Sequence, residues 1–297
     1  RTHGVFEPMS LRLLVVEGNT RAGRERAVAS GGTASSDSYA ELLRSLAPGG
    51  TVVDICYPAD PGANLPDSGG LEGYDGVAIT GSALNVYDGG PSIDPQVDLV
   101  RTLFRTATPC FGSCWGLQVA TVAAGGTVRK NPDGREIGIG RRIEIAEAGH
   151  GHGLYLGKPR IFDAITVHLD EVETLAPGTT VLSTNAWSPV QAAEIDTPGG
   201  GGFWGTQYHP EYTFREIAAV FRRYGDILIK QGLFADEAEQ AAYVADLDAL
   251  HADPAPRPLV WKYGLDESVL DPAMRARELR NWIDQAVLPA RSARGRE

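Results

Sequence analysis

The clearest structural signal in this chain is the stretch Phe111-Gly112-Ser113-Cys114-Trp115-Gly116-Leu117-Gln118. The apolar residues before it predict a short strand, and the residues from Leu117 onward predict a helix that ends at Gly125-Gly126. A cysteine between small residues at such a junction lies on a tight, strained turn, the nucleophile elbow. The helix N-terminus favours the thiolate, which is the form that attacks a carbonyl carbon. A buried structural cysteine is the alternative.

A second motif, far downstream, supplies the groups that a cysteine nucleophile needs. It reads Gly205-Thr206-Gln207-Tyr208-His209-Pro210-Glu211, and its apolar lead-in predicts a strand that ends at the histidine. His209 can take the proton of the thiol, and Glu211 can turn back onto the imidazole if Pro210 bends the chain. A His-Pro-Glu sequence alone is more often a surface turn. Together, at strand ends and in this order, the motifs predict a catalytic triad of Cys114, His209 and Glu211.

These motifs resemble the signature of the class I, or triad-type, glutamine amidotransferases. The resemblance rests on Cys114-x-Gly116-x-Gln118 followed by the His-Pro-Glu motif, and it extends from about Leu11 to about Gln231. It is nearest to the stand-alone, GMP-synthase-like amidotransferase domains. The resemblance implies a flavodoxin-like α/β fold and hydrolysis of a glutamine side-chain amide.

An acyl-transfer site also needs N–H donors at the oxygen of its tetrahedral intermediate. Elbow geometry makes the backbone N–H of Trp115 the first donor. The segment Thr80-Gly81-Ser82-Ala83 occupies the place of the family's Gly-Gly-Pro oxyanion loop, and the resemblance implies that the Ser82 N–H is the second donor. Ser82 departs from the family pattern, because serine reaches a positive φ at a higher cost than glycine.

The resemblance also implies the residues that bind substrate. Gln118 lies one helical turn beyond Cys114, so both side chains can face one cleft, and the matching glutamine of the family contacts the substrate. Gly81 belongs to the oxyanion loop, and His168 and Asp170 belong to a strand that frames the glutamine pocket. Direct catalysis by His168 is the weaker alternative.

The composition predicts an acidic, soluble globular protein. The 297 residues include 42% hydrophobic and 22% charged residues and carry a net charge of -11, which argues against nucleic-acid and membrane partners. No apolar run reaches transmembrane length, and three cysteines favour a reducing, cytoplasmic setting over a disulfide framework. His150 and His152 lack acidic or sulfur partners at ligand spacing, so no metal is expected, and the hydrolysis needs no cofactor.

Alternating strands and helices predict an α/β fold on their own. Apolar runs predict strands at 11–18, 51–57, 76–80 and 203–209. Amphipathic periodicity predicts helices that start at Ser38 and that span 94–106 and 214–230. This order predicts a doubly wound, mostly parallel sheet, with several antiparallel strands between residues 127 and 195. The polar segment 19–37 is expected to be a functional loop.

Composition divides the chain into three parts. Residues 1–10 have no structural pattern and are expected to be disordered or added before a natural start at Met9, residues 11–232 form the catalytic domain, and residues 233–297 form a C-terminal helical extension. In the extension, Asp271 is an N-cap candidate before Pro272. An apolar stripe follows at helical spacing: Leu279, Trp282, Ile283, Ala286 and Val287. We expect it to dock on the catalytic domain, with a homodimer or partner interface as the alternative, and we expect 291–297 to be frayed.

The predicted reaction is amide hydrolysis. Cys114 attacks the side-chain amide of L-glutamine or another γ-glutamyl compound, His209 protonates the departing ammonia and then activates water, and Glu211 orients His209. The chain has no ATP-pyrophosphatase loop and no synthase domain, so any ammonia acceptor lies on a partner chain. One alternative is a γ-glutamyl amide or peptide hydrolase with water as its sole acceptor and a wider pocket. Another is a binding or regulatory module without turnover, which the altered loop at Ser82 keeps open.

Overall fold

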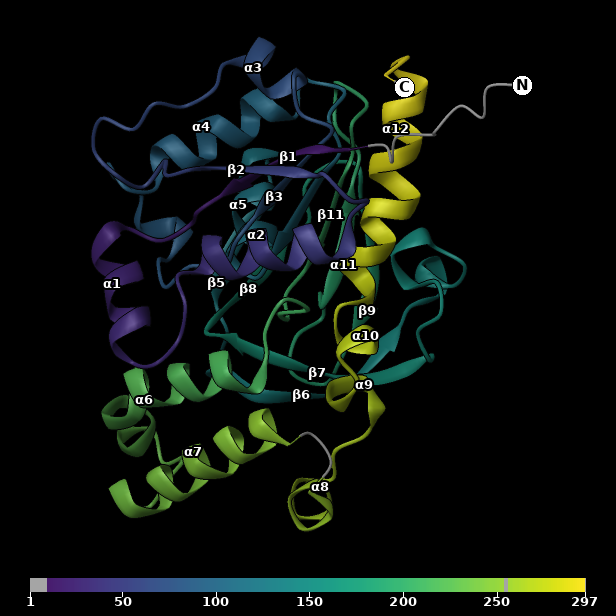
Figure 1. Ribbon diagram of the computed structural model, residues 1–297. Coiled ribbons are helices and arrows are strands. Elements are labelled where there is room, and N and C mark those ends of the chain that lie inside the picture. The colour runs from purple at the N-terminus through teal and green to yellow at the C-terminus, as the bar shows by residue number, and fades with distance from the viewer. Residues whose placement is uncertain (1–9, 254–255, 297) are drawn as a thin grey trace.

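The structure, a computed structural model, describes residues 10–253 and 256–296 and is built around a mixed sheet (Figure 1). Within this part of the chain the sheet has nine strands in the order β2-β1-β3-β4-β11-β10-β9-β6-β7. The first five are parallel: β2 (Val52–Cys56), β1 (Arg12–Val16), β3 (Gly76–Ile79), β4 (Cys110–Ser113) and β11 (Phe203–Thr206). The others join antiparallel: β10 (Ala192–Ile195), β9 (Thr179–Thr184), β6 (Glu136–Ile145) and β7 (Ile161–His168). A separate ribbon pairs β5 (Thr127–Lys130) with β8 (Asp170–Thr174).

The parallel strands are buried because helices cover both faces of the sheet. In β1, Leu14 and Val16 enter the core that α4 (Asp94–Leu103) and α5 (Trp115–Ala123) cover. Leu13 and Val15 enter the opposite core, which α2 (Ser35–Leu46) covers. Burial on both faces explains why these strands are continuous apolar runs in the sequence. The predicted α/β, doubly wound fold is confirmed, and the flavodoxin-like order belongs to the parallel half of the sheet.

A third core lies beyond the antiparallel strands, under two long helices. Helices α6 (Phe214–Lys230) and α7 (Glu237–Ala252) pack on each other and on Ile165 of β7. Figure 1 shows this pair across one end of the molecule, away from α3 and α4. The short helical elements between the strands are α3 (Ser68–Glu72), η1 (Val86–Asp88), η2 (Glu147–Gly149) and η3 (Gly153–Tyr155).

The segment 19–37 is not the loop that its polar sequence predicts. It contains helix α1 (Arg21–Ala29), which begins after Thr20, whose hydroxyl accepts a hydrogen bond of 3.2 Å from the Gly23 N–H. Only Ala27 of this helix is buried, so the segment has no apolar periodicity that would reveal a helix. Helix α2 likewise starts three residues before Ser38, and the distant Glu17 carboxylate accepts a bond of 2.8 Å from the Ser36 N–H.

The C-terminal extension folds back onto the sheet, as predicted. Its elements after α7 are α8 (Arg257–Tyr263), α9 (Glu267–Leu270), α10 (Pro272–Arg275), α11 (Arg277–Trp282), the π-helical η4 (Ile283–Val287) and α12 (Leu288–Ala293). The Asp271 carboxylate caps α10 by accepting a bond of 2.9 Å from the Ala273 N–H, which confirms the N-cap. Four residues of the predicted stripe are fully buried in the α2-side core, and Ala286 packs against it. The docked arrangement is therefore confirmed, whereas the domain boundary at residue 232 stays a prediction.

The predicted fraying after residue 290 is wrong for the described residues, which end at Arg296. Arg291, Arg294 and Arg296 all lie within 4.0 Å of the carboxylate of Asp75, which precedes β3. A buried carboxylate needs such partners, and it fixes the end of the chain to the sheet. The predicted N-terminal segment lies outside the described residues, except for the exposed Ser10.

Candidate active site

Cys114 occupies the turn between β4 and α5 in the strained conformation that an elbow requires. Its φ of 53° and ψ of -101° are unusual for a residue other than glycine. The flanking glycines are needed for space, because a Cβ on Gly112 would lie 2.7 Å from the Gly116 backbone, and one on Gly116 would lie 2.7 Å from Ile79 O. The Cys114 Sγ lies 3.5 Å from Val167 O. The predicted elbow is confirmed as a feature of the backbone.

The other two cysteines have the surroundings of structural thiols. Cys56 and Cys110 are buried and free of disulfides. Burial raises the pKa of both thiols, to about 12 for Cys56, so both stay protonated and inert. Cys56 and Cys110 therefore have the character of structural thiols, whereas Cys114 differs from them in its strained backbone and in lining a cleft.

His209 and Glu211 form the second half of the site. Nδ1 of the imidazole lies 2.7 Å from Glu211 Oε1, and both side chains are buried. Burial lowers the pKa of His209, but the negative charge of Glu211 and the hydrogen bond to it outweigh burial, and the pKa is raised to about 10. A raised pKa favours the imidazolium form of the ring, which is the form that would stabilise a Cys114 thiolate in the same cleft. Tyr212, which sequence analysis missed, stacks on the ring with centroids 4.0 Å apart.

The loop after β3 closes over the triad. A Cβ on Gly81 would lie 2.7 Å from His209 Cε1, so only glycine leaves room for the imidazole. Asn19 holds this loop: its Nδ2 donates to Gly81 O at 3.2 Å, and its Oδ1 accepts from the Ala83 N–H at 3.1 Å. These bonds fix the orientation of the peptide that carries the Ser82 N–H. Asn19 was missed by sequence analysis, although its position just after β1 is where a parallel sheet places its site residues.

Hydrogen bonds join three of the four predicted substrate-binding residues, while the fourth, Gly81, lies in the loop after β3. Gln118 Nε2 donates to Asp170 O at 3.2 Å, which joins the elbow helix to β8. His168 uses both ring nitrogens, with Nε2 2.8 Å from Glu136 Oε2 and Nδ1 2.9 Å from Asp170 O. Neither nitrogen is free to act as a base, which agrees with a framing role for His168. The Asp170 carboxylate accepts from the Tyr87 hydroxyl at 2.9 Å, and burial raises its pKa.

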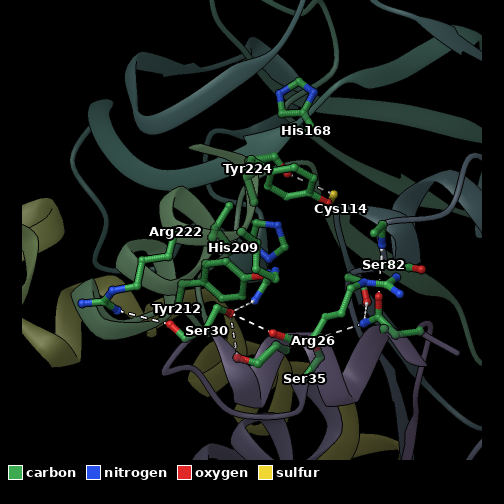
Figure 2. Close-up of a pocket in the computed structure, with 18 of the residues that line it drawn as sticks. Arg26, Ser30, Ser35, Ser82, Cys114, His168, His209, Tyr212, Arg222 and Tyr224 are labelled. Carbon is green, nitrogen blue, oxygen red and sulfur yellow. Dashed lines mark hydrogen bonds between the residues drawn. The ribbon is translucent and has the colours of Figure 1, made fainter. Parts of the chain in front are cut away.

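Cys114 opens into a cleft of about 1320 Å³. In Figure 2, His168 lies at one end and Arg26 and Ser30 lie at the other, with Cys114 and His209 between them. Sequence analysis missed most of its charged lining. Five arginines and two aspartates line the cleft: Arg26, Arg135, Arg215, Arg222, Arg223, Asp170 and Asp248. Three of the arginines lie on α6, one lies on α1 and one precedes β6, so no single basic run in the sequence marks the set.

Arg135 has the clearest unused binding capacity of these residues. Its guanidinium lies 5.0 Å from the centre of the Tyr224 ring, and its buried Nε has no hydrogen-bond partner in the described part of the chain. Arg135 precedes Glu136 at the start of β6, where Glu136 pairs with His168 across the sheet. It therefore stands at the same end of the cleft as His168 and Asp170.

A metal site and a membrane span are not found in residues 10–253 and 256–296. No group of three or more His, Cys, Asp and Glu side chains there could hold a metal ion. The His152 ring instead lies 3.2 Å from the Glu194 carboxylate and packs edge-on against Trp204. No helix in these ranges has the length and apolar character to cross a membrane.

The family model for "Glutamine amidotransferase class-I" matches residues 36–223, which include the elbow and the His-Pro-Glu turn. The chain belongs to the class-I glutamine amidotransferases. A glutamine amidotransferase from Thermotoga maritima has the same fold, with a TM-score of 0.63 over 94% of this chain and 99% of that one, at 17% identity.

Relatives of this amidotransferase chain differ in what they hydrolyse. A Pseudomonas γ-glutamyl-L-1-hydroxyisopropylamide hydrolase is 34% identical over 286 residues, which are 94% of each chain. γ-Glutamyl peptidase 3 of Arabidopsis thaliana is 27% identical over 63% of this chain and 74% of its own length. A GMP synthase of Streptomyces coelicolor is 33% identical over 136 residues, which are 46% of this chain and 23% of that protein. The match to the Pseudomonas enzyme includes the C-terminal extension, whereas the match to the synthase is confined to a fraction of its length.

Proposed function

We propose that this chain hydrolyses γ-glutamyl amides to glutamate and an amine, with water as the acceptor. The observation that carries the proposal is the size of the cleft. Cys114 and His209 line a cleft with a volume of about 1320 Å³. A typical small-molecule pocket has a volume of about 300–1,000 Å³. L-Glutamine alone would leave most of this space unfilled. The end-to-end similarity to a γ-glutamyl amide hydrolase supports the same choice. Three free cysteines are consistent with a reducing compartment such as the cytoplasm.

In the proposed mechanism the Cys114 thiolate attacks the γ-carbonyl carbon of the substrate. Negative charge develops on the carbonyl oxygen, which accepts hydrogen bonds from the N–H groups of Trp115 and Ser82. His209, held by Glu211 at 2.7 Å, donates its proton to the amide nitrogen as the C–N bond breaks and the amine leaves. The resulting thioester is attacked by water, whose proton returns to His209. The C–S bond then breaks and glutamate is released.

We further propose that the end of the cleft near His168 binds the amino-acid head of the γ-glutamyl group. Arg135 offers a guanidinium with an unpaired, buried Nε, which suits the α-carboxylate. Asp170 offers a carboxylate, which suits the α-ammonium group. The two charges lie close enough for Arg135 to oppose the rise that burial causes in the pKa of Asp170. Gln118 would position the segment between head and amide, since it bonds the backbone of Asp170.

A second candidate function is the release of ammonia from L-glutamine for a synthase on a partner chain. The local similarity to a GMP synthase favours it. L-Glutamine is also the smallest γ-glutamyl amide, so the same triad would act on it. The two functions differ in whether substituted amides are hydrolysed.

The test measures glutamate release from γ-glutamylethylamide and from L-glutamine by the purified chain. We expect kcat/KM for the ethylamide to equal or exceed that for glutamine, with one ethylamine formed for each glutamate. The Cys114→Ala variant, which removes the sulfur without adding bulk, is the matched control and should release neither product. Hydrolysis of L-glutamine with no hydrolysis of any substituted γ-glutamyl amide would refute the proposal in favour of ammonia supply.

A further inference from the structure

The cleft is rich in positive charge, although the chain as a whole is acidic. Five arginines and two aspartates line it, against a net charge of -11 for the chain. Asp248 forms an ion pair with Arg222, and Asp170 lies at the far end, near His168. Three arginines at the outer end of the cleft have no carboxylate within ion-pair distance among the described residues: Arg26, Arg215 and Arg223.

These three arginines lie on two helices in contact, Arg26 on α1 and the other two on α6, whose side chains bond to the end of α1. Arg215 Nε donates to Gly31 O at 3.0 Å, and Arg223 Nη1 donates to Ser30 Oγ at 3.2 Å. The exposed side chain of Arg26 makes no hydrogen bond or ion pair to the described part of the chain. A guanidinium carries five N–H donors, so these neutral contacts leave most of the donors unused. Like charges gathered at one cleft repel each other unless an anion neutralises them.

The position of this cluster relative to the triad indicates which part of a substrate it would meet. His209 must protonate the leaving nitrogen, so the leaving group has to lie on the imidazole side of the carbonyl carbon. Tyr212 stacks on that ring and also lines the cleft, and it precedes α6, the helix that carries Arg215 and Arg223. Figure 2 places Arg26 beyond His209 and opposite His168. The γ-glutamyl head and the leaving group would therefore occupy opposite ends.

We propose that Arg26 and Arg223 form an anion subsite that binds a carboxylate on the leaving amine, with Arg215 beside them. The inference rests on the proposed function and names its substrate class: γ-glutamyl amino acids and peptides, in preference to γ-glutamyl derivatives of neutral amines. The guanidinium fork matches a carboxylate with two parallel hydrogen bonds. Hydrolysis then breaks the γ-glutamyl C–N bond, adds water, and releases glutamate and an amino acid or peptide.

Two substrates that differ only in charge test this subsite: γ-glutamylglycine and γ-glutamylglycinamide. A charge-assisted hydrogen bond lost on going to the amide corresponds to a ratio of kcat/KM of about 10–100 in favour of the acid. The ratio should fall when the salt concentration rises from about 50 to about 500 mM, because exposed charges are screened. In the Arg26→Gln/Arg223→Gln variant, the ratio should approach 1.

The controls separate the subsite from the fold and from the catalytic proposal. Arg21→Gln changes an arginine on the same helix that pairs with Glu25 and does not line the cleft, so its ratio should equal that of the unaltered chain. Arg26→Gln alone removes no bond that holds the fold, and it should lower the ratio even if the double variant is unstable. A ratio near 1 for the unaltered chain, with both substrates hydrolysed, overturns this inference and leaves the proposed function standing. No glutamate from either substrate overturns both.

Discussion

Replacing Trp282 by alanine tests whether the C-terminal extension is part of the folded core. The Trp282 side chain is fully buried, and its ring lies 5.9 Å from that of Phe111 in β4, the strand that leads to Cys114. Its tip fills the space over Gly76, where an added Cβ would come within 2.9 Å of the indole. The buried Nε1 has no hydrogen-bond partner among the described residues, so packing is what the substitution removes. Replacement of a large buried aromatic residue by alanine costs about 3–5 kcal/mol.

The assay is urea denaturation followed by far-ultraviolet circular dichroism, with the free energy of unfolding compared between variants. Trp261→Ala is the matched control, because Trp261 lies in the same extension and is 74% exposed. We expect that control to change the free energy by about 0.5 kcal/mol or less. Two results would refute the docked arrangement in favour of an interface between chains. One is a loss of unfolding free energy below about 1 kcal/mol for Trp282→Ala. The other is a loss that depends on protein concentration and comes with a smaller mass in solution.

Three further predictions concern the triad and the buried charges behind it. Cys114→Ala should abolish glutamate release and leave the melting temperature unchanged. Cys110→Ser should keep the activity and lose about 1–3 kcal/mol of stability, because it buries a hydroxyl group. The opposite pattern would show that Cys114 is not the nucleophile. In the folded protein the pKa of His209 is raised to about 10. The charged ring therefore stabilises the fold fully at pH values below the unfolded pKa of about 6.5. This contribution is lost as the pH rises through about 10. In a pH profile, kcat/KM should therefore decline near pH 10, and a decline near pH 7 would contradict the ion pair. Glu278→Gln leaves buried Lys158, now 3.0 Å from that carboxylate, without a counter-charge, so urea denaturation should reveal a loss of about 3–5 kcal/mol.

Much of the fold and of the triad followed from local sequence. The elbow was predictable because small residues flank Cys114 at a strand–helix junction, and the tight turn there gives Cys114 its strained φ of 53°. The bond between His209 and Glu211 was predictable because proline between them forces a bend. The docked stripe was predictable because Trp282 and its neighbours repeat at helical spacing. In each case the deciding contacts lie within a few residues of one another, or depend only on apolar burial.

Other features could not be predicted from the sequence, because their partners are distant along the chain. Helix α1 has a polar surface on nearly all sides, so its structure depends on a cap at Thr20 and on α6, which lies far away in sequence. The fixed end of the chain depends on the buried carboxylate of Asp75, which only the folded sheet places beside the last arginines. Neither feature is marked by a periodic apolar pattern or by a short motif, so the sequence does not indicate it.

The sequence by itself determined the class-I amidotransferase fold and predicted its nucleophile and base, because these depend on short motifs and on alternating apolar runs. The tertiary structure alone decided the character of the cleft. Arg26, Arg135 and Arg223 come from α1, the start of β6 and α6, and they share a cleft only because the sheet and the helix pair bring those elements together. Electrostatic attraction acts through space, so a binding surface made of single charges from separate elements leaves no pattern in a linear sequence.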